Sequence, residues 1–235
     1  FADYQDKLKK ARVIIDRNER KRLIQEEAQK LADAKKLRLR EDEALLEEVA
    51  GLVEWPNILM GSIDEEFMEV PSEALVSAMR SHQKYFSLEA SDGSLAPHFI
   101  TVSNMPSDST RDATIIAGNE KVLKARLSDA RFFWDKDLKS KLDERVPALS
   151  KINFFDKLGS LGDKSERLQK LVPTICEFIG LDNVNGAVKA ARLAKADLST
   201  MMVNEFPELQ GVMGGYYASA DGEPPEVCRA ISGQY

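Results

Sequence analysis

One acidic residue, Asp197, stands in an otherwise apolar stripe and is the first candidate for chemistry. In the segment KAARLAKADLSTMM, helical spacing gives it the following neighbours on one face: Ala190, Leu193, Ala194 and Met201. A carboxylate on such a face is buried, and this costs about 1–3 kcal/mol even when burial is partly compensated. Asp197 must therefore be held by a metal ion, or by Arg192, Lys195 or nearby backbone N–H groups. We predict the second arrangement.

The metal alternative can be judged from the residue that precedes Asp197. A helix of the form AAxLxHD is the signature of the metal-dependent HD phosphohydrolases, in which the adjacent His and Asp both bind the metal. Here Ala196 occupies the histidine position, and the two histidines, His82 and His98, lie about a hundred residues earlier. We therefore predict a structural buried acid, no metal ligand and no catalytic residue. Replacing Asp197 by Asn should lower stability without removing a metal-dependent reaction.

Other motifs that signal catalysis are missing from the sequence. It contains no GxxxxGK[ST] loop, no CxxC pair and no Ser-His-Asp order. Cys176 and Cys228 lie far apart in apolar helical contexts, which predicts free buried thiols. The segment EFPELQGVMGGYY either offers hydrogen bonds to a partner or only shapes a helix corner, and the sequence leaves both open.

Five cationic side chains and one histidine are candidates for contact with RNA phosphates. Three lie at a predicted helix-to-strand junction and three on a predicted helix rich in aromatic residues: Arg80, His82 and Lys84 in MRSHQKYF, and Lys121, Lys124 and Arg126 in GNEKVLKARLSDARFFW. Aromatic residues at helical spacing usually belong to a core, so we predict that Phe132, Phe133 and Trp134 are structural.

Composition limits the kind of nucleic-acid contact that is possible. The 235 residues are 43% hydrophobic and 31% charged, as in a globular protein, and the net charge is −6. An acidic chain does not bind nucleic acid indiscriminately, so any RNA contact must be local, and no DNA partner is expected. Because no apolar run approaches the roughly 20 residues that span a bilayer, we expect a cytoplasmic location and no membrane partner.

The fold class predicted from the apolar patterns is α+β, in three parts. Residues 1–54 should form two helices, the first capped by Asp16 and Glu19 and running to about Lys36. Their apolar stripes are Leu23, Ile24, Ala28 and Leu31, then Leu45, Leu46, Val49, Leu52 and Val53. The basic stretch LKKARVIIDRNERKRL is either an RNA-facing arm or a solvated helix face, and its interleaved acids favour the latter.

Residues 55–150 should form an α+β domain. The segments NILMGSI, EEFMEV, KYFSLEA and HFITVSN have strand character, with a hairpin turn at SDG and one helix beginning at Pro71. A long helix is predicted from Asn119, as N-cap, to Leu138, with an Arg126–Asp129 ion pair. Residues 151–235 should be entirely helical, the second domain beginning between positions 145 and 160.

Several blocks, in the same order, resemble the beta subunit of the bacterial two-subunit (alpha2beta2) glycyl-tRNA synthetase. They are VEWPNILMGSIDEEFMEVPSEALVSAMRSHQKYF, HFITVSN, GNEKVLKARLSDARFFWDKDL, KLGSLGDKSERL, KADL followed by EFPELQGVMGGYYA, and DGEPPEVCRAISGQY. The resemblance implies that this chain is an internal part of a longer subunit. It also implies that residues 55–150 are similar to the editing-type domain of the phenylalanyl-tRNA synthetase beta chain, and that residues 151–235 form a degenerate HD-like domain.

The function that the resemblance implies is a non-catalytic one within glycine–tRNA ligase. The alpha subunit carries the chemistry with ATP and Mg, so no cofactor is expected in this chain, and the partners implied are the alpha subunit and tRNA-Gly. An architectural module that holds the alpha subunit without touching RNA is the main alternative, and a metal-dependent HD-type phosphohydrolase is a weaker one. An editing activity is not implied, because similarity of fold does not carry activity and a hydrolytic sieve for glycine has no obvious logic.

Overall fold

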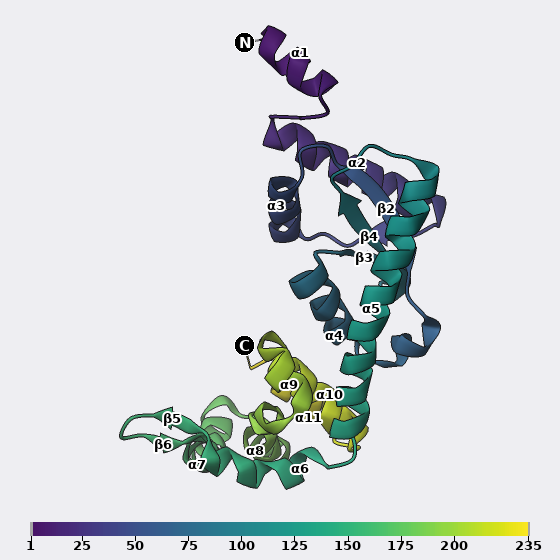
Figure 1. Ribbon diagram of the computed structural model, residues 1–235. Helices are drawn as coiled ribbons and strands as arrows, with labels where there is room; N and C mark the ends of the chain where they lie inside the picture. Colours follow the sequence, from purple (N-terminus) through teal and green to yellow (C-terminus); the bar gives the residue numbers. More distant parts are fainter. Residues whose placement is uncertain (1, 235) are drawn as a thin grey trace. The chain divides into compact units, whose positions relative to one another are not determined.

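The computed structural model describes residues 2–234 and divides into two compact units, with the division between Asp129 and Ala130. The α+β prediction is confirmed, because one unit contains an antiparallel sheet with helices and the other is mainly helical. Each unit is described by itself below. Figure 1 gives the element labels used throughout.

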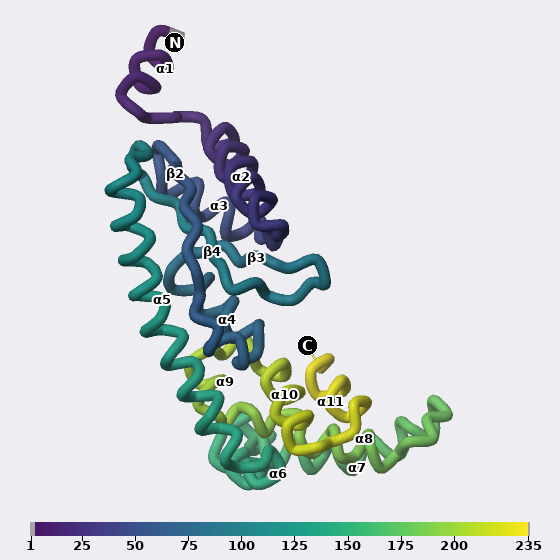
Figure 2. The backbone as a smooth tube through the Cα atoms, turned by 90° about the vertical axis from the view of Figure 1, so that its right-hand side faces the viewer, coloured from purple at the N-terminus to yellow at the C-terminus, as the bar shows by residue number. Residues whose placement is uncertain are grey.

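The first unit is built from eleven elements, the last of which continues past the division. They are α1 (Ala2–Lys10), α2 (Arg17–Ala34), β1 (Arg38–Leu39), α3 (Glu43–Leu52), β2 (Asn57–Ser62), η1 (Glu65–Glu69), α4 (Ser72–Ala78), η2 (Met79–Gln83), β3 (Phe86–Glu89), β4 (Leu95–Ser103) and α5 (Ser109–Asp137). The strands pair antiparallel in the order β1-β3-β4-β2. In Figures 1 and 2 the sheet lies between α5 and the pair α2 and α3.

The two faces of the sheet follow the alternation of side chains along each strand. One face packs on α2 and α3 in a single core that includes Ile24, Ala28, Leu45, Val49, Phe86, Leu88 and Ile100. The other face carries Phe99, whose ring stacks on Tyr85 with centroids 4.6 Å apart. A Cβ on Gly61 would lie 2.4 Å from the Phe99 ring, so only glycine fits on the neighbouring strand.

Most short-range predictions for this unit are confirmed. Asp16 caps α2 as predicted by accepting hydrogen bonds from Asn18 N and Glu19 N, but the Glu19 carboxylate pairs with Lys9 and does not complete a capping box. The predicted hairpin joins β3 to β4 through Gly93. Its φ of 84° is a conformation that glycine adopts without the steric penalty of other residues. The prediction that Leu52 belongs to the buried apolar stripe of α3 is wrong, because this side chain is 63% exposed.

Two elements of the first unit differ from prediction. EEFMEV is not a strand, since Glu65–Glu69 form a 3-10 helix that buries Phe67 and leaves the acids in solvent. Asn119 is not an N-cap, because α5 begins ten residues earlier, where the Asp108 carboxylate accepts Arg111 N–H at 2.9 Å. The polar segment NMPSDSTRD thus contains the true start of the helix. Polar residues at a first turn resemble a loop in sequence.

The second unit consists of the end of α5 and eleven further elements: α6 (Leu142–Arg145), η3 (Val146–Lys151), β5 (Asn153–Phe155), β6 (Gly159–Ser160), α7 (Leu161–Ile179), α8 (Val184–Leu193), η4 (Ala196–Ser199), α9 (Met201–Glu205), η5 (Pro207–Leu209), α10 (Val212–Ala220) and α11 (Pro225–Ser232). Helix α7 packs on α8, α8 on α11, and α11 on α10. The prediction of an entirely helical segment is wrong at β5 and β6, which form a small antiparallel hairpin.

Candidate functional site

The predicted RNA-contact residues Arg80, His82 and Lys84 lie on a π-helical turn that ends α4. Met79–Gln83 form this turn, and Lys84 ends it in the left-handed conformation with φ of 58°. Arg80 Nε lies 2.5 Å from Asp42 Oδ2, and Lys84 Nζ lies 2.8 Å from Glu48 Oε1. Partial burial alone would raise the pKa of Asp42, but the hydrogen bonds from Arg80 and Leu45 N–H lower it. Arg80 and Lys84 are therefore both tied to acids at α3, while His82 is exposed.

The other three cations lie in the middle of α5. Lys124 Nζ is 2.6 Å from Asp64 Oδ2, and this hydrogen bond raises the pKa of Lys124. Lys121 is exposed and, with Lys124, lines a surface cavity of about 240 Å³ beside η1. Arg126 and Asp129 are both exposed, and within residues 2–234 no ion pair joins them, contrary to prediction. The apolar side of α5 lies at Leu123, Leu127 and Ala130 instead.

Tyr85 connects the two groups of cations. It follows the π-helical turn directly, and its hydroxyl donates to Asn119 Oδ1 in the middle of α5. Burial raises the pKa of Tyr85 to about 12, so the phenol remains a hydrogen-bond donor at neutral pH. Asn119 Nδ2 donates to Ile115 O at 2.7 Å, which explains how an asparagine is satisfied inside a helix. The turn that carries Arg80 therefore contacts the segment of α5 that precedes Lys121.

The six candidates differ in how much of their charge is already neutralised. Arg80, Lys84 and Lys124 are in ion pairs. Among the residues that the structure describes, no carboxylate lies within ion-pair distance of Lys121, Arg126 or His82. An anionic ligand can therefore bind Lys121, Arg126 or His82 without first displacing a carboxylate.

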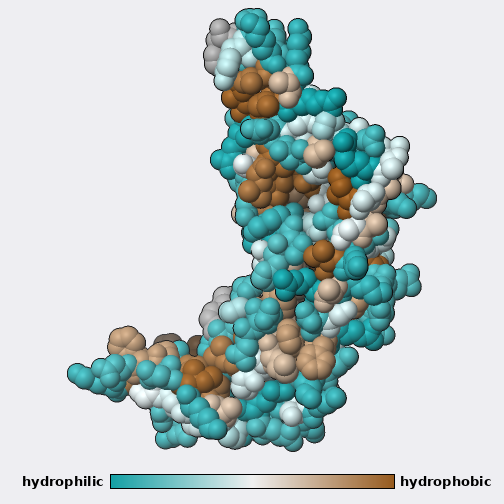
Figure 3. All heavy atoms as spheres, in the orientation of Figure 1, coloured by the Kyte–Doolittle hydropathy of each residue, from teal (hydrophilic) through white to brown (hydrophobic). Residues whose placement is uncertain are grey.

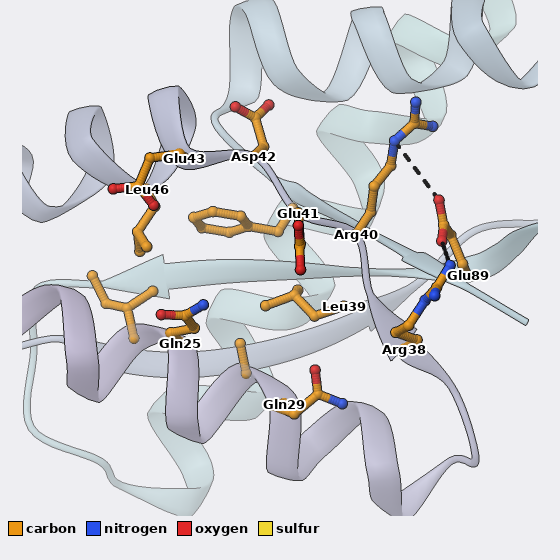
Figure 4. Close-up of a pocket in the computed structure, with 13 residues that line it drawn as sticks. Gln25, Gln29, Arg38, Leu39, Arg40, Glu41, Asp42, Glu43, Leu46 and Glu89 are labelled. Atoms are coloured by element: carbon orange, nitrogen blue, oxygen red, sulfur yellow. Dashed lines mark hydrogen bonds and ion pairs between the residues drawn. The ribbon is translucent and has the colours of Figure 1, made fainter. Parts of the chain in front are cut away.

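A larger groove of about 720 Å³ lies between α2, β1 and α3 (Figure 4). Its floor is apolar and includes Phe86 and Leu46, whereas its rim is polar. Arg38 and Arg40 on this rim are both directed to Glu89, at 2.6 and 3.8 Å. The remaining acids that line the groove are Glu41, Asp42 and Glu43. With four acids against two arginines, this groove does not favour phosphate.

Asp197 is fully buried, in the 3-10 helix η4 rather than in a continuous helix from α8. Its Oδ2 accepts hydrogen bonds from Gly211 N (2.6 Å) and Gly214 N (3.1 Å) at the start of α10. Gly211 reaches this position with φ of 85°, a conformation that favours glycine. Burial raises the pKa of Asp197, although these hydrogen bonds act in the opposite direction. The segment from Gly211 to Gly214 thus forms a helix start whose N–H groups bind Asp197. Arg192, one of the predicted partners of Asp197, pairs instead with Asp143 at 2.7 Å.

A second buried acid, Asp137, was missed by the sequence analysis. It is 2% exposed at the end of α5 and accepts hydrogen bonds from Met201 N, Met202 N, Arg145 and the hydroxyl of Tyr217. Trp134, one turn earlier, stacks on Tyr217 with centroids 5.2 Å apart. Phe132, predicted to be structural, is 55% exposed. Cys176 and Cys228 are free, but only Cys176 is fully buried.

The described residues contain neither a cluster of potential metal ligands nor a helix suited to a membrane. Within residues 2–234 no three His, Cys, Asp or Glu side chains lie close enough together to hold a metal ion. No helix in the same part of the chain combines the length and apolarity needed to cross a bilayer.

Comparison with known proteins places the whole chain in one family. The family model for the glycyl-tRNA synthetase beta subunit matches residues 1–235. A glycine–tRNA ligase beta subunit of Rhodospirillum centenum is 52% identical over 241 residues, which cover 100% of this chain and 33% of the relative. Those of Phenylobacterium zucineum and Chromohalobacter salexigens are each 48% identical, covering 100% and 99% of this chain and 35% and 33% of the relatives.

These relatives are, by name, subunits of an aminoacyl-tRNA synthetase. The chain belongs to the family of glycyl-tRNA synthetase beta subunits. It spans about a third of the length of the curated relatives it matches.

Proposed function

We propose that this chain is a non-catalytic part of a glycine–tRNA ligase, where it contacts tRNA-Gly and supports assembly with the alpha subunit. Glycine activation, with ATP and Mg, takes place on the alpha subunit in this proposal. The single observation that carries it is the family match across the whole chain. In the same proposal residues 55–150 are related to the editing-type domain of the phenylalanyl-tRNA synthetase beta chain. Residues 151–235 form a degenerate HD-like domain in which Ala196 replaces a metal-binding histidine.

In this proposal six side chains of the first unit contact RNA, and they do so in two ways. Lys121, Arg126 and His82 contact phosphate directly, because no carboxylate competes for them among the described residues. Arg80, Lys84 and Lys124 exchange a carboxylate for a phosphate when tRNA binds. Such exposed ion pairs contribute about 0–1 kcal/mol, so an RNA phosphate can displace them at low cost. This arrangement also reconciles RNA binding with a net charge of −6, since the basic residues act locally.

The test is charge reversal in the complete enzyme, with Arg80, Lys84, Lys121 and Lys124 each changed to Glu. We expect glycine activation to persist and tRNA charging to fall at least about tenfold, equivalent to about 1.4 kcal/mol of tRNA-binding free energy. The salt slope of tRNA binding should also fall by about one for each lysine or arginine that no longer binds a phosphate.

The matched control is Lys30→Glu, which reverses an exposed lysine on α2 that pairs with Glu27 of its own helix. It should leave both assays unchanged. Equal loss of activation and charging in the four-residue variant would contradict an RNA role and indicate damage to assembly.

A second candidate function is architectural, in which the first unit holds the alpha subunit without touching RNA. The observation that favours it is the pairing of three of the six candidate cations with acids. The two functions differ in salt dependence, because phosphate contacts release counterions and protein contacts between neutral surfaces do not. A tRNA affinity that is insensitive to the charge reversals at every salt concentration would favour the architectural function.

A further inference from the structure

Helix α7 has a wider apolar surface than the second unit covers. Its buried side carries Leu161, Ser165 and Cys176. An adjoining side carries Leu171, Ile175 and Phe178, which are 52%, 45% and 90% exposed. These three residues are spaced i, i+4 and i+7, so they form a row on one side of the helix. The row is not covered by any described part of the chain.

The β5–β6 hairpin extends this row into a larger apolar surface. Phe154 and Phe155 on the hairpin are 37% and 64% exposed. Lys164 Nζ lies 4.0 Å from the centroid of the Phe154 ring. Because Lys164 precedes Leu171 by seven residues and Phe178 by fourteen, it lies on the same side of α7 as the row. The hairpin therefore adjoins the side of α7 that carries the row.

We name this surface the Phe178 face and define it as Phe154, Phe155, Leu171, Ile175 and Phe178. Figure 3 shows apolar residues gathered at the surface beside the hairpin. Isolated exposed apolar side chains are common, but an ordered group with a phenylalanine 90% exposed marks a site of interaction. Burying such side chains contributes about 1.5–3 kcal/mol each. The i, i+4, i+7 spacing is the pattern by which one helix packs along another.

We propose that the Phe178 face is covered by an amphipathic helix from the part of the family's polypeptide that has no counterpart in this chain. The relatives are covered to only 33–35% of their length, so about two thirds of their polypeptide lies outside the matched region. The face consists of five side chains, whereas a stable interface between separate proteins uses roughly 20–30 residues on each side. A small face suffices when its partner is tethered, because tethering raises the effective concentration to about the millimolar range.

This inference rests on the family match and on the exposure of α7, and it does not depend on the RNA contact proposed above. It predicts that α7 is a joint between the second unit and the remaining polypeptide. Loss of tRNA binding by the first unit would leave it unaffected. The experiment must therefore identify the segment that covers Phe178, without any measurement of tRNA charging.

The experiment is Phe178→p-benzoylphenylalanine in the full-length beta subunit assembled with its partner subunit, followed by irradiation and mass spectrometry of the crosslinked peptides. Folding is not at risk, since the side chain is 90% exposed. We expect a crosslink within the same polypeptide, to a segment outside the region that corresponds to residues 1–235. A crosslink to the other subunit, to a second copy of the beta subunit or to tRNA, or no crosslink, would overturn the proposal.

Two variants sharpen this experiment. Ile175→Asp places a charge in the centre of the face and should reduce the crosslink at least tenfold, whereas Glu177→Gln on the opposite side of α7 should not. The matched probe is Leu52→p-benzoylphenylalanine, at an exposed leucine of α3 in the first unit. This probe should not crosslink to the segment captured from Phe178. Capture of the same segment from both positions would show nonspecific reaction and overturn the assignment.

Discussion

Two buried carboxylates in the second unit perform the same structural task by different means. Asp137 binds the first N–H groups of α9, at Met201 and Met202, and Asp197 binds N–H groups at the start of α10, at Gly211 and Gly214. Each acid thus satisfies donors that a helix leaves free at its amino end. Asp137 also accepts from Arg145 and Tyr217, whereas both hydrogen bonds to Asp197 reach Oδ2 and its Oδ1 has no partner among the described residues.

The two acids differ in whether an ion-pair partner is present among the described residues. Asp137 has a counter-charge in Arg145, whose side chain is only 16% exposed, so each ion depends on the other. Burial raises the pKa of Asp197, and its two backbone hydrogen bonds and the charge of Lys195 oppose this rise only in part. We expect the energetic cost of losing an acid to be large at Asp137 and moderate at Asp197. The predictions below test this ordering.

The largest effect is expected for Asp137→Ala. The change leaves Arg145 buried without its ion-pair partner and also frees two N–H groups and the hydroxyl of Tyr217. Breaking a buried ion pair from one side costs about 3–5 kcal/mol. The measurement is urea unfolding of this chain in a Trp55→Phe background, so that Trp134 fluorescence reports on the second unit.

The control for this change is Asp135→Ala on the same helix. Asp135 is exposed and lies 3.9 Å from Arg131, so its loss should change the free energy of unfolding by less than about 0.5 kcal/mol. An Asp137→Ala variant as stable as this control would show that Asp137 and Arg145 do not form a coupled pair.

The sequence contained the information needed to predict one of these acids and, in part, the other. Asp197 was identified because apolar residues surround it at helical spacing. Asp137 continues the stripe Leu123, Leu127, Ala130 and Trp134 by one more step of three residues, but its neighbours Lys136 and Lys139 suggest a solvated helix end. Periodicity therefore signalled burial at both positions, and local charge obscured the second.

Long-range partners were beyond what periodicity can reveal. Arg80 pairs with Asp42, and Lys124 with Asp64, across 38 and 60 positions of the chain. These pairings decide which candidate cations remain available to a phosphate, so the sequence could nominate the six residues without grading them. The β5–β6 hairpin was missed for a related reason. Its strands are three and two residues long, too short to display an alternation.

A smaller effect, with a distinctive pH dependence, is expected for Asp197→Asn. The amide retains an oxygen that accepts from Gly211 and Gly214, but its NH2 group is buried without an acceptor. We expect a loss of about 1–2 kcal/mol at pH values below the raised pKa of the wild-type carboxyl. The measurement is the same unfolding experiment at a series of pH values from about 4 upward.

The sign of the pH dependence follows from the raised pKa of Asp197. Between the ordinary carboxyl pKa and the raised one, the folded chain binds more protons than the unfolded chain, so the wild type loses stability as the pH rises. Asn does not titrate, and the stability difference between the wild type and the variant should therefore shrink across this window. A difference that grows with pH would mean that the ionised carboxylate is favoured in the fold, as at a site with a counter-charge.

The smallest effect is expected for Arg192→Ala, which asks whether Arg192 supports Asp197. Arg192 pairs with Asp143 at 2.7 Å, and both side chains are more than two-fifths exposed, so the loss should be about 0–1 kcal/mol. Combined with Asp197→Asn, the two changes should add to within about 0.5 kcal/mol, because they share no hydrogen-bond partner. If Arg192 supplied the missing counter-charge, the double variant would instead lose less than the sum of the two single changes. Additivity would exclude Arg192 as a counter-charge for Asp197, in contrast to Arg145, which pairs with Asp137.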